Sequence, residues 1–184
     1  MNKLKIVLIS IVALVLGGCA SGAKMDAMIL ANSETTNATY DNALKNEVSV
    51  EKVKGGKETN PAWTSQISDK AFMGALKSSL KSHGLYGEKG RYHLTAELQK
   101  LDQPLFGLDM TVTSHVNYKL VDSATGEVVM EKLVVTPYTA TVGDAFAGVT
   151  RLRMANEGAG KENIRGLLDA LAKLNIEANQ VSMN

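Results

Sequence analysis

The chain has 184 residues, and its 20 lysines and arginines nearly balance its 19 aspartates and glutamates. This balance argues against a nucleic-acid-binding protein, which would present a strongly basic face. The single cysteine, Cys19, excludes an internal disulfide and any metal site built from several cysteines. The length is enough for one domain, which must be stabilised by packing its own hydrophobic core.

The first nineteen residues have the organisation of a secretory signal. Two lysines precede an apolar run over residues 6–16, and two glycines then stand directly before Cys19. The run is shorter than the roughly 20 apolar residues that a membrane-spanning helix requires. We therefore expect residues 1–18 to be a signal peptide that is cleaved between Gly18 and Cys19.

This junction resembles the lipobox of bacterial lipoproteins, in which the cysteine is acylated and becomes the mature N-terminus. The resemblance implies that Cys19 carries several acyl chains, palmitate among them, which together hold a protein stably on a bilayer. Ala20 follows the cysteine, where an aspartate would imply retention at the inner membrane. The resemblance therefore implies an outer-membrane protein that faces the periplasm and is held by membrane lipid.

Residues 19–46 are predicted to be the lipidated N-terminus and a tether. Their side chains are mostly small and polar and show no sustained periodicity, as is typical of a loosely packed linker. The alternative is that the apolar residues of this segment dock on the domain or on a partner; these are Met25, Met28, Ile29 and Leu30.

The first regular elements follow this segment. Valines at alternate positions predict a short strand that begins near Val48 and closes at the glycines of 55–56. A helix is predicted from about Ser68 to His83, because Ser68 is a suitable N-cap and apolar residues then recur every three or four positions.

Three strands come next in succession. Apolar and polar residues alternate over 92–99 and again over 109–120, which predicts two strands that each bury one face. A compact turn at 122–126 leads to a third strand over 127–139, which is apolar on both faces, so its register is left open. Together the three strands predict an antiparallel meander with one covered face.

A long helix is predicted over 145–174, with Asp144 as its cap. Its middle contains Gly158 and Gly160, each of which costs about 1 kcal/mol relative to alanine in a helix interior. The helix therefore either approaches a neighbour closely at this point or kinks. The residues expected on its buried face are Phe146, Val149, Leu152, Ala159, Leu167, Leu171 and Leu174.

The order strand, helix, three strands, helix predicts an α+β fold. Two helices would pack on one face of a four-stranded, mainly antiparallel sheet, in a single periplasmic domain over 47–175. Residues 176–184 are expected to be a polar tail.

No catalytic residue, metal or cofactor is predicted. The sequence has neither a Gly-x-Ser-x-Gly motif nor a glycine-rich phosphate loop. His93 and His115 share the polar face of the predicted sheet with Glu97 and Asp109, so an acid/base or metal cluster is conceivable. Their spacing is not that of a compact zinc motif. A solvated sheet face is the favoured interpretation, and it is one candidate binding surface.

Trp63 is the only tryptophan. We expect it to pack over the edge of the domain, with stacking on a ligand as the alternative.

The long helix carries the other candidate binding surface. Charges of both signs cluster at its centre, and Glu157 and Lys161 have the spacing of an ion pair. This face is either a solvated helix surface or a docking surface for a partner protein. The two glycines favour the second interpretation, because they permit a close backbone approach. The candidate residues, which include one aromatic of the preceding connector, are Tyr138, Arg151, Arg153, Asn156, Glu157 and Arg165.

Longer segments resemble a family of uncharacterised Gram-negative lipoproteins. The resemblance is carried by NPAWTSQI, LDQPLFGLDMTV and PYTATVGDAFAGVTRLRMANEGA, and the order of elements is similar to that of the lipopolysaccharide-assembly lipoprotein LptE. Similar chains sometimes carry the label UDP-N-acetylglucosamine acyltransferase, but such enzymes are built from hexapeptide repeats, and no such period is present. The resemblance implies a non-catalytic assembly factor or carrier with a protein partner in the envelope. An enzyme acting on lipid or cell-wall precursors is the alternative.

Overall fold

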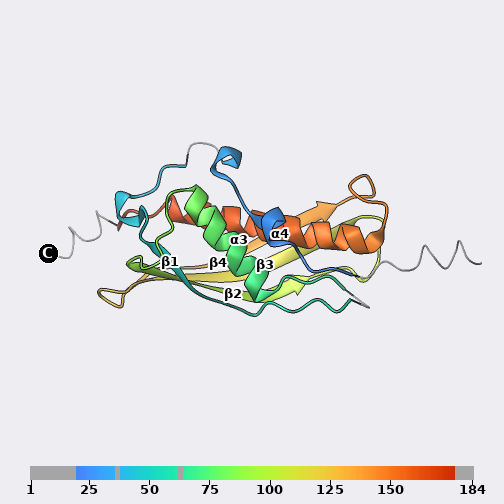
Figure 1. Ribbon diagram of the computed structural model, residues 1–184, viewed down its shortest axis with the longest axis horizontal. Helices are drawn as coiled ribbons and strands as arrows, with labels where there is room; N and C mark the ends of the chain where they lie inside the picture. Colours follow the sequence, from blue (N-terminus) through green and yellow to red (C-terminus); the bar gives the residue numbers. More distant parts are fainter. Residues whose placement is uncertain (1–19, 36–37, 62–63, 177–184) are drawn as a thin grey trace, which may run out of the picture.

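The structure is a computed structural model that describes residues 20–35, 38–61 and 64–176. Four strands form one sheet in the order β1-β2-β3-β4, and α3 and α4 lie together on one of its faces (Figure 1). The predicted α+β fold is confirmed. The signal peptide, Cys19, Trp63 and residues 177–184 lie outside the described residues.

The strands alternate between one buried and one open face. β1 is parallel to β2, whereas β2, β3 and β4 form the predicted antiparallel meander. On β2, every second residue from Tyr92 to Leu98 is buried, and the residues between them are not. The bounds are Val48–Lys54 for β1, Tyr92–Asp102 for β2, Met110–Asp122 for β3 and Val128–Ala140 for β4.

The helix α3, Asp69–Ser82, begins and ends as predicted. The Ser68 hydroxyl accepts a hydrogen bond from the backbone N–H of Ala71 (3.3 Å), which satisfies a donor that the first turn would leave unpaired. Gly84 follows with a φ of 68°, the left-handed conformation that commonly ends a helix. The apolar face of α3 packs on the sheet through Phe72 and Leu76.

The helix α4, Gly148–Leu171, begins three residues later and ends three residues earlier than predicted. The Asp144 cap is wrong, because its carboxylate faces back along the chain and accepts hydrogen bonds from the backbone N–H and hydroxyl of Thr141 (2.7 and 2.9 Å). These two donors lower the pKa of Asp144. Phe146 and Val149, expected to be buried, are exposed: Phe146 lies in the connector before α4, and Val149 lies in the first turn of the helix.

The glycines in the middle of α4 permit close approach, one of the two predicted alternatives. The helix is continuous through both. A Cβ on Gly158 would lie 2.2 Å from the ring of Tyr138 on β4, and a Cβ on Gly160 would lie 2.7 Å from the sulfur of Met28. The glycines therefore let α4 lie directly against β4 on one side and the N-terminal residues on the other.

The N-terminal segment of residues 20–46 packs on the two helices, so the prediction of a tether is wrong for its described part. It contains α2, Met25–Met28, and two short 3-10 helices, Asn32–Glu34 and Asn42–Leu44. Met28, Leu30 and Leu44 are fully buried in the core. The Leu30 N–H donates to the Ser79 hydroxyl of α3 (2.9 Å). The segment buries a few isolated apolar side chains, which leave no periodic pattern in the sequence.

Candidate functional site

The predicted docking surface on α4 is largely internal. Arg151, Asn156 and Glu157 are buried. The Asn156 amide donates to the Ser65 carbonyl (3.0 Å), and its oxygen accepts from the Gln103 amide (2.6 Å). These side chains join α4 to the rest of the fold, so they are not available to another molecule.

The outer charges of α4 bind the N-terminal segment. Arg153 donates to the Ser21 hydroxyl (3.0 Å), and Arg165 donates to the Glu34 carbonyl (2.9 Å). The predicted pair of Glu157 and Lys161 is wrong, because Lys161 binds Glu34, whereas Glu157 accepts from the backbone N–H of Lys24 and pairs with Arg153. The partner that this charged face binds is therefore an earlier part of the same chain.

Arg151 holds two loops together at one end of the molecule. Its Nη1 donates to the carbonyls of Ala145 (2.7 Å) and Phe146 (2.6 Å), in the connector from β4 to α4. Its Nη2 donates to the Gly107 carbonyl (3.3 Å), in the loop from β2 to β3. One buried guanidinium thus fixes two segments that are far apart in the sequence.

We predict that Arg151→Gln loosens both loops. A charged hydrogen bond contributes roughly 1.5–3 kcal/mol, and glutamine cannot replace all three donors. Amide hydrogen exchange in 105–109 and 141–147 should therefore accelerate, while exchange in α3 stays unchanged. Arg153→Gln, two residues further along, is the matched control and should leave both loops protected. Unchanged exchange in Arg151→Gln would show that the loops are held by other contacts.

Tyr138 is the sixth candidate residue, and it lies on β4 rather than in a loop. It is paired with Val112 of β3, and one side of its ring lies against Gly158. The side chain remains 39% exposed. Among the residues predicted to form the docking surface of the long helix and its connector, Tyr138 thus keeps a solvent-accessible edge.

The histidines of the sheet are separated. His93 is opposite Val121 and His115 is opposite Lys100, so the two lie toward different ends of β3. The Nδ1 atom of His93 lies 3.9 Å from a carboxylate oxygen of Glu51, and the His115 Nε2 atom lies 3.1 Å from one of Asp102. The conceivable cluster with Glu97 and Asp109 is not formed. Within the described residues, no three His, Cys, Asp or Glu side chains are placed to hold one metal ion.

The open face of the sheet, the side away from α3 and α4, carries charged and polar side chains. Lys54 pairs with Glu97 (2.9 Å), and the Asn117 amide donates to the Glu131 carboxylate (3.2 Å). A shallow hollow of about 290 Å³ lies over this region, lined by Lys52, Lys54, Thr95, Ala96, Glu97, Asn117, Lys119 and Glu131. Its mixed charges suit hydrogen bonding and ion pairing with another polar surface.

Two apolar side chains of β4 lie beside this hollow. Leu133 is opposite Asn117 and Val135 is opposite His115, and about half of each apolar side chain is exposed. Their signal in the sequence is the third predicted strand, which is apolar on both faces. We define the open-face site as these two residues together with Lys54, Glu97, Asn117, Lys119 and Glu131.

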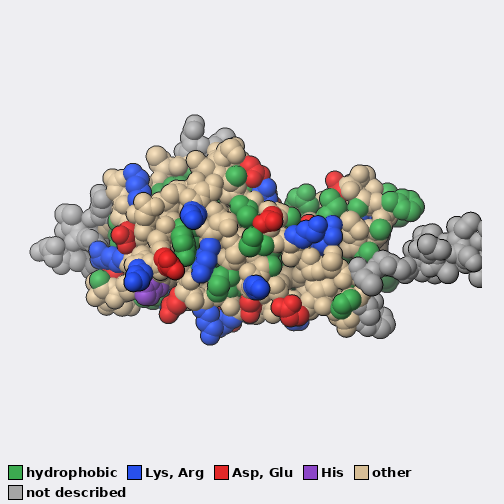
Figure 2. Space-filling view, in the orientation of Figure 1, with side chains coloured by type: hydrophobic (Ala, Val, Ile, Leu, Met, Phe, Trp, Pro, Cys, Tyr) green, Lys and Arg blue, Asp and Glu red, His purple; other side chains and the backbone are tan. Residues whose placement is uncertain are grey.

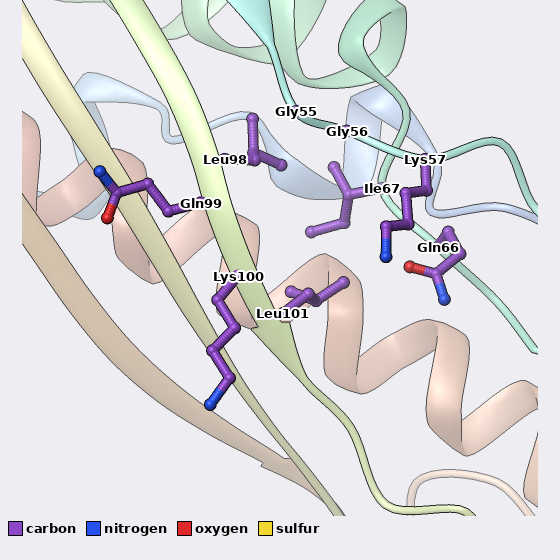
Figure 3. Close-up of a pocket in the computed structure, with 9 residues that line it drawn as sticks. All are labelled: Gly55, Gly56, Lys57, Gln66, Ile67, Leu98, Gln99, Lys100 and Leu101. Carbon is purple, nitrogen blue, oxygen red and sulfur yellow. The ribbon is translucent and has the colours of Figure 1, made fainter.

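A second groove, of about 170 Å³, lies where β1 leaves the sheet (Figure 3). Gly55 turns the chain away with a φ of 89°, and a Cβ there would lie 2.2 Å from the Leu98 carbonyl oxygen. The charged residues of the lining are Lys57 and Lys100, and Lys100 pairs with Asp102 (2.7 Å). The lining thus has no carboxylate or imidazole that could act as an acid or base.

The fold is shared with solved structures, although no family model and no curated protein matches the chain. The chain is similar to protein XCC0632 from Xanthomonas campestris, of the family DUF330, with a TM-score of 0.54 and 14% identity over 82% of this chain and 97% of that one. It is also similar to a candidate lipoprotein from Caulobacter crescentus CB15, with a TM-score of 0.50 and 14% identity over 71% and 90%. This α+β fold therefore also occurs in lipoproteins of Gram-negative bacteria.

No helix in the part of the chain that the structure describes combines the length and the hydrophobicity needed to span a bilayer.

Proposed function

We propose that this chain is a lipid-anchored accessory protein of the outer membrane, facing the periplasm, which binds a protein partner of the envelope and catalyses no reaction. The observation that carries the proposal is the two-sided sheet. Its inner face is covered by α3 and α4, on which the N-terminal segment packs, whereas the open-face site is left to solvent. The sequence adds the lipobox-like junction at Cys19.

The open-face site suits a protein surface better than a lipid or a nucleic acid. Lysines and glutamates both lie on this face, so a partner with complementary charges of both signs would fit, and Leu133 and Val135 add an apolar part beside the hollow. The enzyme alternative requires histidines gathered with a carboxylate in a pocket. Instead, His93 and His115 each contact a different carboxylate on this face.

Anchoring is tested by metabolic labelling with a palmitate analogue. Wild-type protein should incorporate the label and fractionate with the outer membrane. Cys19→Ser should lose the label and leave the membrane fraction. An unlabelled wild-type protein would refute lipid anchoring.

Partner binding is tested by photo-crosslinking in intact cells. A photoreactive amino acid in place of Leu133 should crosslink to a specific envelope protein, and the charge reversal Lys119→Glu in the same chain should abolish that product. The matched control replaces Lys81, an exposed residue of α3 on the other side of the molecule. If position 81 gives the same product, or if Lys119→Glu has no effect, the open-face site is not the binding surface.

A further inference from the structure

An apolar tip stands at the end of the molecule where Arg151 joins the two loops. We define it as Leu105, Phe106, Leu108 and Phe146, which are 94%, 85%, 78% and 89% exposed. Single exposed apolar residues are ordinary, whereas a group of large ones from two separate loops indicates an interaction surface. The loops are held side by side by Arg151 and by a hydrogen bond from the Val142 N–H to the Asp109 carboxylate (3.4 Å).

The charge around the tip does not suit an ionic partner. Residues 103–109 and 141–149 contain no lysine or arginine. Their two carboxylates, Asp109 and Asp144, accept hydrogen bonds from Val142 and Thr141 in the same two loops. Any contact made here must therefore come from burial of the Phe and Leu side chains.

The described chain begins at this same end. The Ala20 N–H donates to the Pro61 carbonyl (2.9 Å), and the Ser21 hydroxyl accepts from Arg153, which is two residues from Arg151 on α4. In Figure 1 the blue start of the described chain and the orange connection from β4 to α4 lie at one end, and the turn from β3 to β4 lies at the other. Figure 2 shows hydrophobic side chains gathered at the first of these ends. Cys19 directly precedes Ala20.

We propose that the apolar tip inserts into the phospholipid bilayer beside the acylated Cys19. The inference rests on the proposed function in one respect, the lipid on Cys19. Once the acyl chains hold Ala20 at the surface, the tip is already at the bilayer, so its own weak affinity acts at a high effective concentration. Phenylalanine and leucine are the side chains that bury in the headgroup and acyl boundary.

Attachment through both the acylated Cys19 and the apolar tip fixes the orientation of the domain relative to the bilayer. The strands run from the tip toward the turn between β3 and β4, so this turn, residues 123–127, is held at the end away from the bilayer. The open-face site then lies along the side of the molecule, where a neighbouring membrane protein can meet it.

The test uses the full, acylated protein in vesicles of phosphatidylethanolamine and phosphatidylglycerol. Leu108→Cys is labelled with an environment-sensitive fluorophore, and some of the lipids carry bromine in their acyl chains. Ala124→Cys, in the distant turn, is the labelled control. We expect a blue shift and severalfold stronger quenching at position 108 than at 124. Phe106→Gln with Phe146→Gln should abolish the difference, whereas Leu133→Gln with Val135→Gln on the open face should leave it intact.

The outcomes separate the two proposals. Mass spectrometry of the N-terminal peptide reports acylation independently: an unmodified Cys19 overturns both. An acylated protein whose label at 108 is quenched no more than the label at 124 overturns insertion of the tip alone. A blue shift without quenching by brominated lipid also overturns it, since a second copy or another protein would then cover the tip.

Discussion

Asn163→Ala is expected to lower the free energy of unfolding by about 2–4 kcal/mol, because several buried polar groups lose their partner at once. Asn163 of α4 is fully buried under the sheet. Its oxygen accepts from the Tyr118 hydroxyl of β3 (2.9 Å), and its amide donates to the carbonyls of Ser114 (3.2 Å) and Val134 (3.0 Å). One side chain thus joins α4 to two neighbouring strands of the meander, β3 and β4.

Urea unfolding of the protein in detergent measures this effect, with Tyr118→Phe as the control. Burial raises the pKa of the Tyr118 hydroxyl, which therefore stays protonated as a donor. Its removal deletes a single hydrogen bond and should cost about 1 kcal/mol. In the double variant the two losses should not add, because both remove the same bond. A loss below 1 kcal/mol in Asn163→Ala would mean that water replaces the amide.

Leu30→Ala is expected to lower the free energy of unfolding by about 2–5 kcal/mol, the usual cost of truncating a buried leucine. Leu30 belongs to the N-terminal segment and is fully buried. Met25→Ala is the matched control, because Met25 lies in the same segment and is 39% exposed. Its replacement should change stability by less than about 0.5 kcal/mol.

The same urea unfolding measurement distinguishes an N-terminal segment that is packed on the domain from one that is detached. If residues 20–46 were detached in solution, Leu30→Ala and Met25→Ala would have equally small effects. A large effect of Leu30→Ala, with one transition for the whole chain, would show that the segment unfolds together with the domain.

Most of the sheet and α3 could be predicted because their signals are local. The alternation over β2 and β3 reports one buried face directly, and Ser68 and Gly84 mark the ends of α3 in the sequence itself. The start of α4 could not be placed, because Asp144 looks like a cap in sequence, and only the folded connector shows that it binds Thr141 instead.

The candidate site was misplaced for a non-local reason. Arg151, Asn156 and Glu157 are charged or polar residues in an amphipathic helix, so the sequence pattern predicts solvent exposure. Their partners come from Gly107, Ser65 and Lys24, which are distant in the sequence and carry no signal of their own. The open-face site could be anticipated as a polar face, whereas the apolar tip could not, since its two loops meet only in the fold.

The hydrogen bond between Ala20 and Pro61 also limits how far the domain can move from an anchor at Cys19. A flexible tether over residues 19–46 would let the domain move to distances of roughly 30 Å from its anchor. With the fold already beginning at Ala20, the slack between an acylated Cys19 and the domain is a single peptide unit, about 4 Å. If Cys19 is acylated as proposed, the domain would not reach far into the periplasm to find a partner. The partner that we propose would then be embedded in the same membrane or be delivered to its surface.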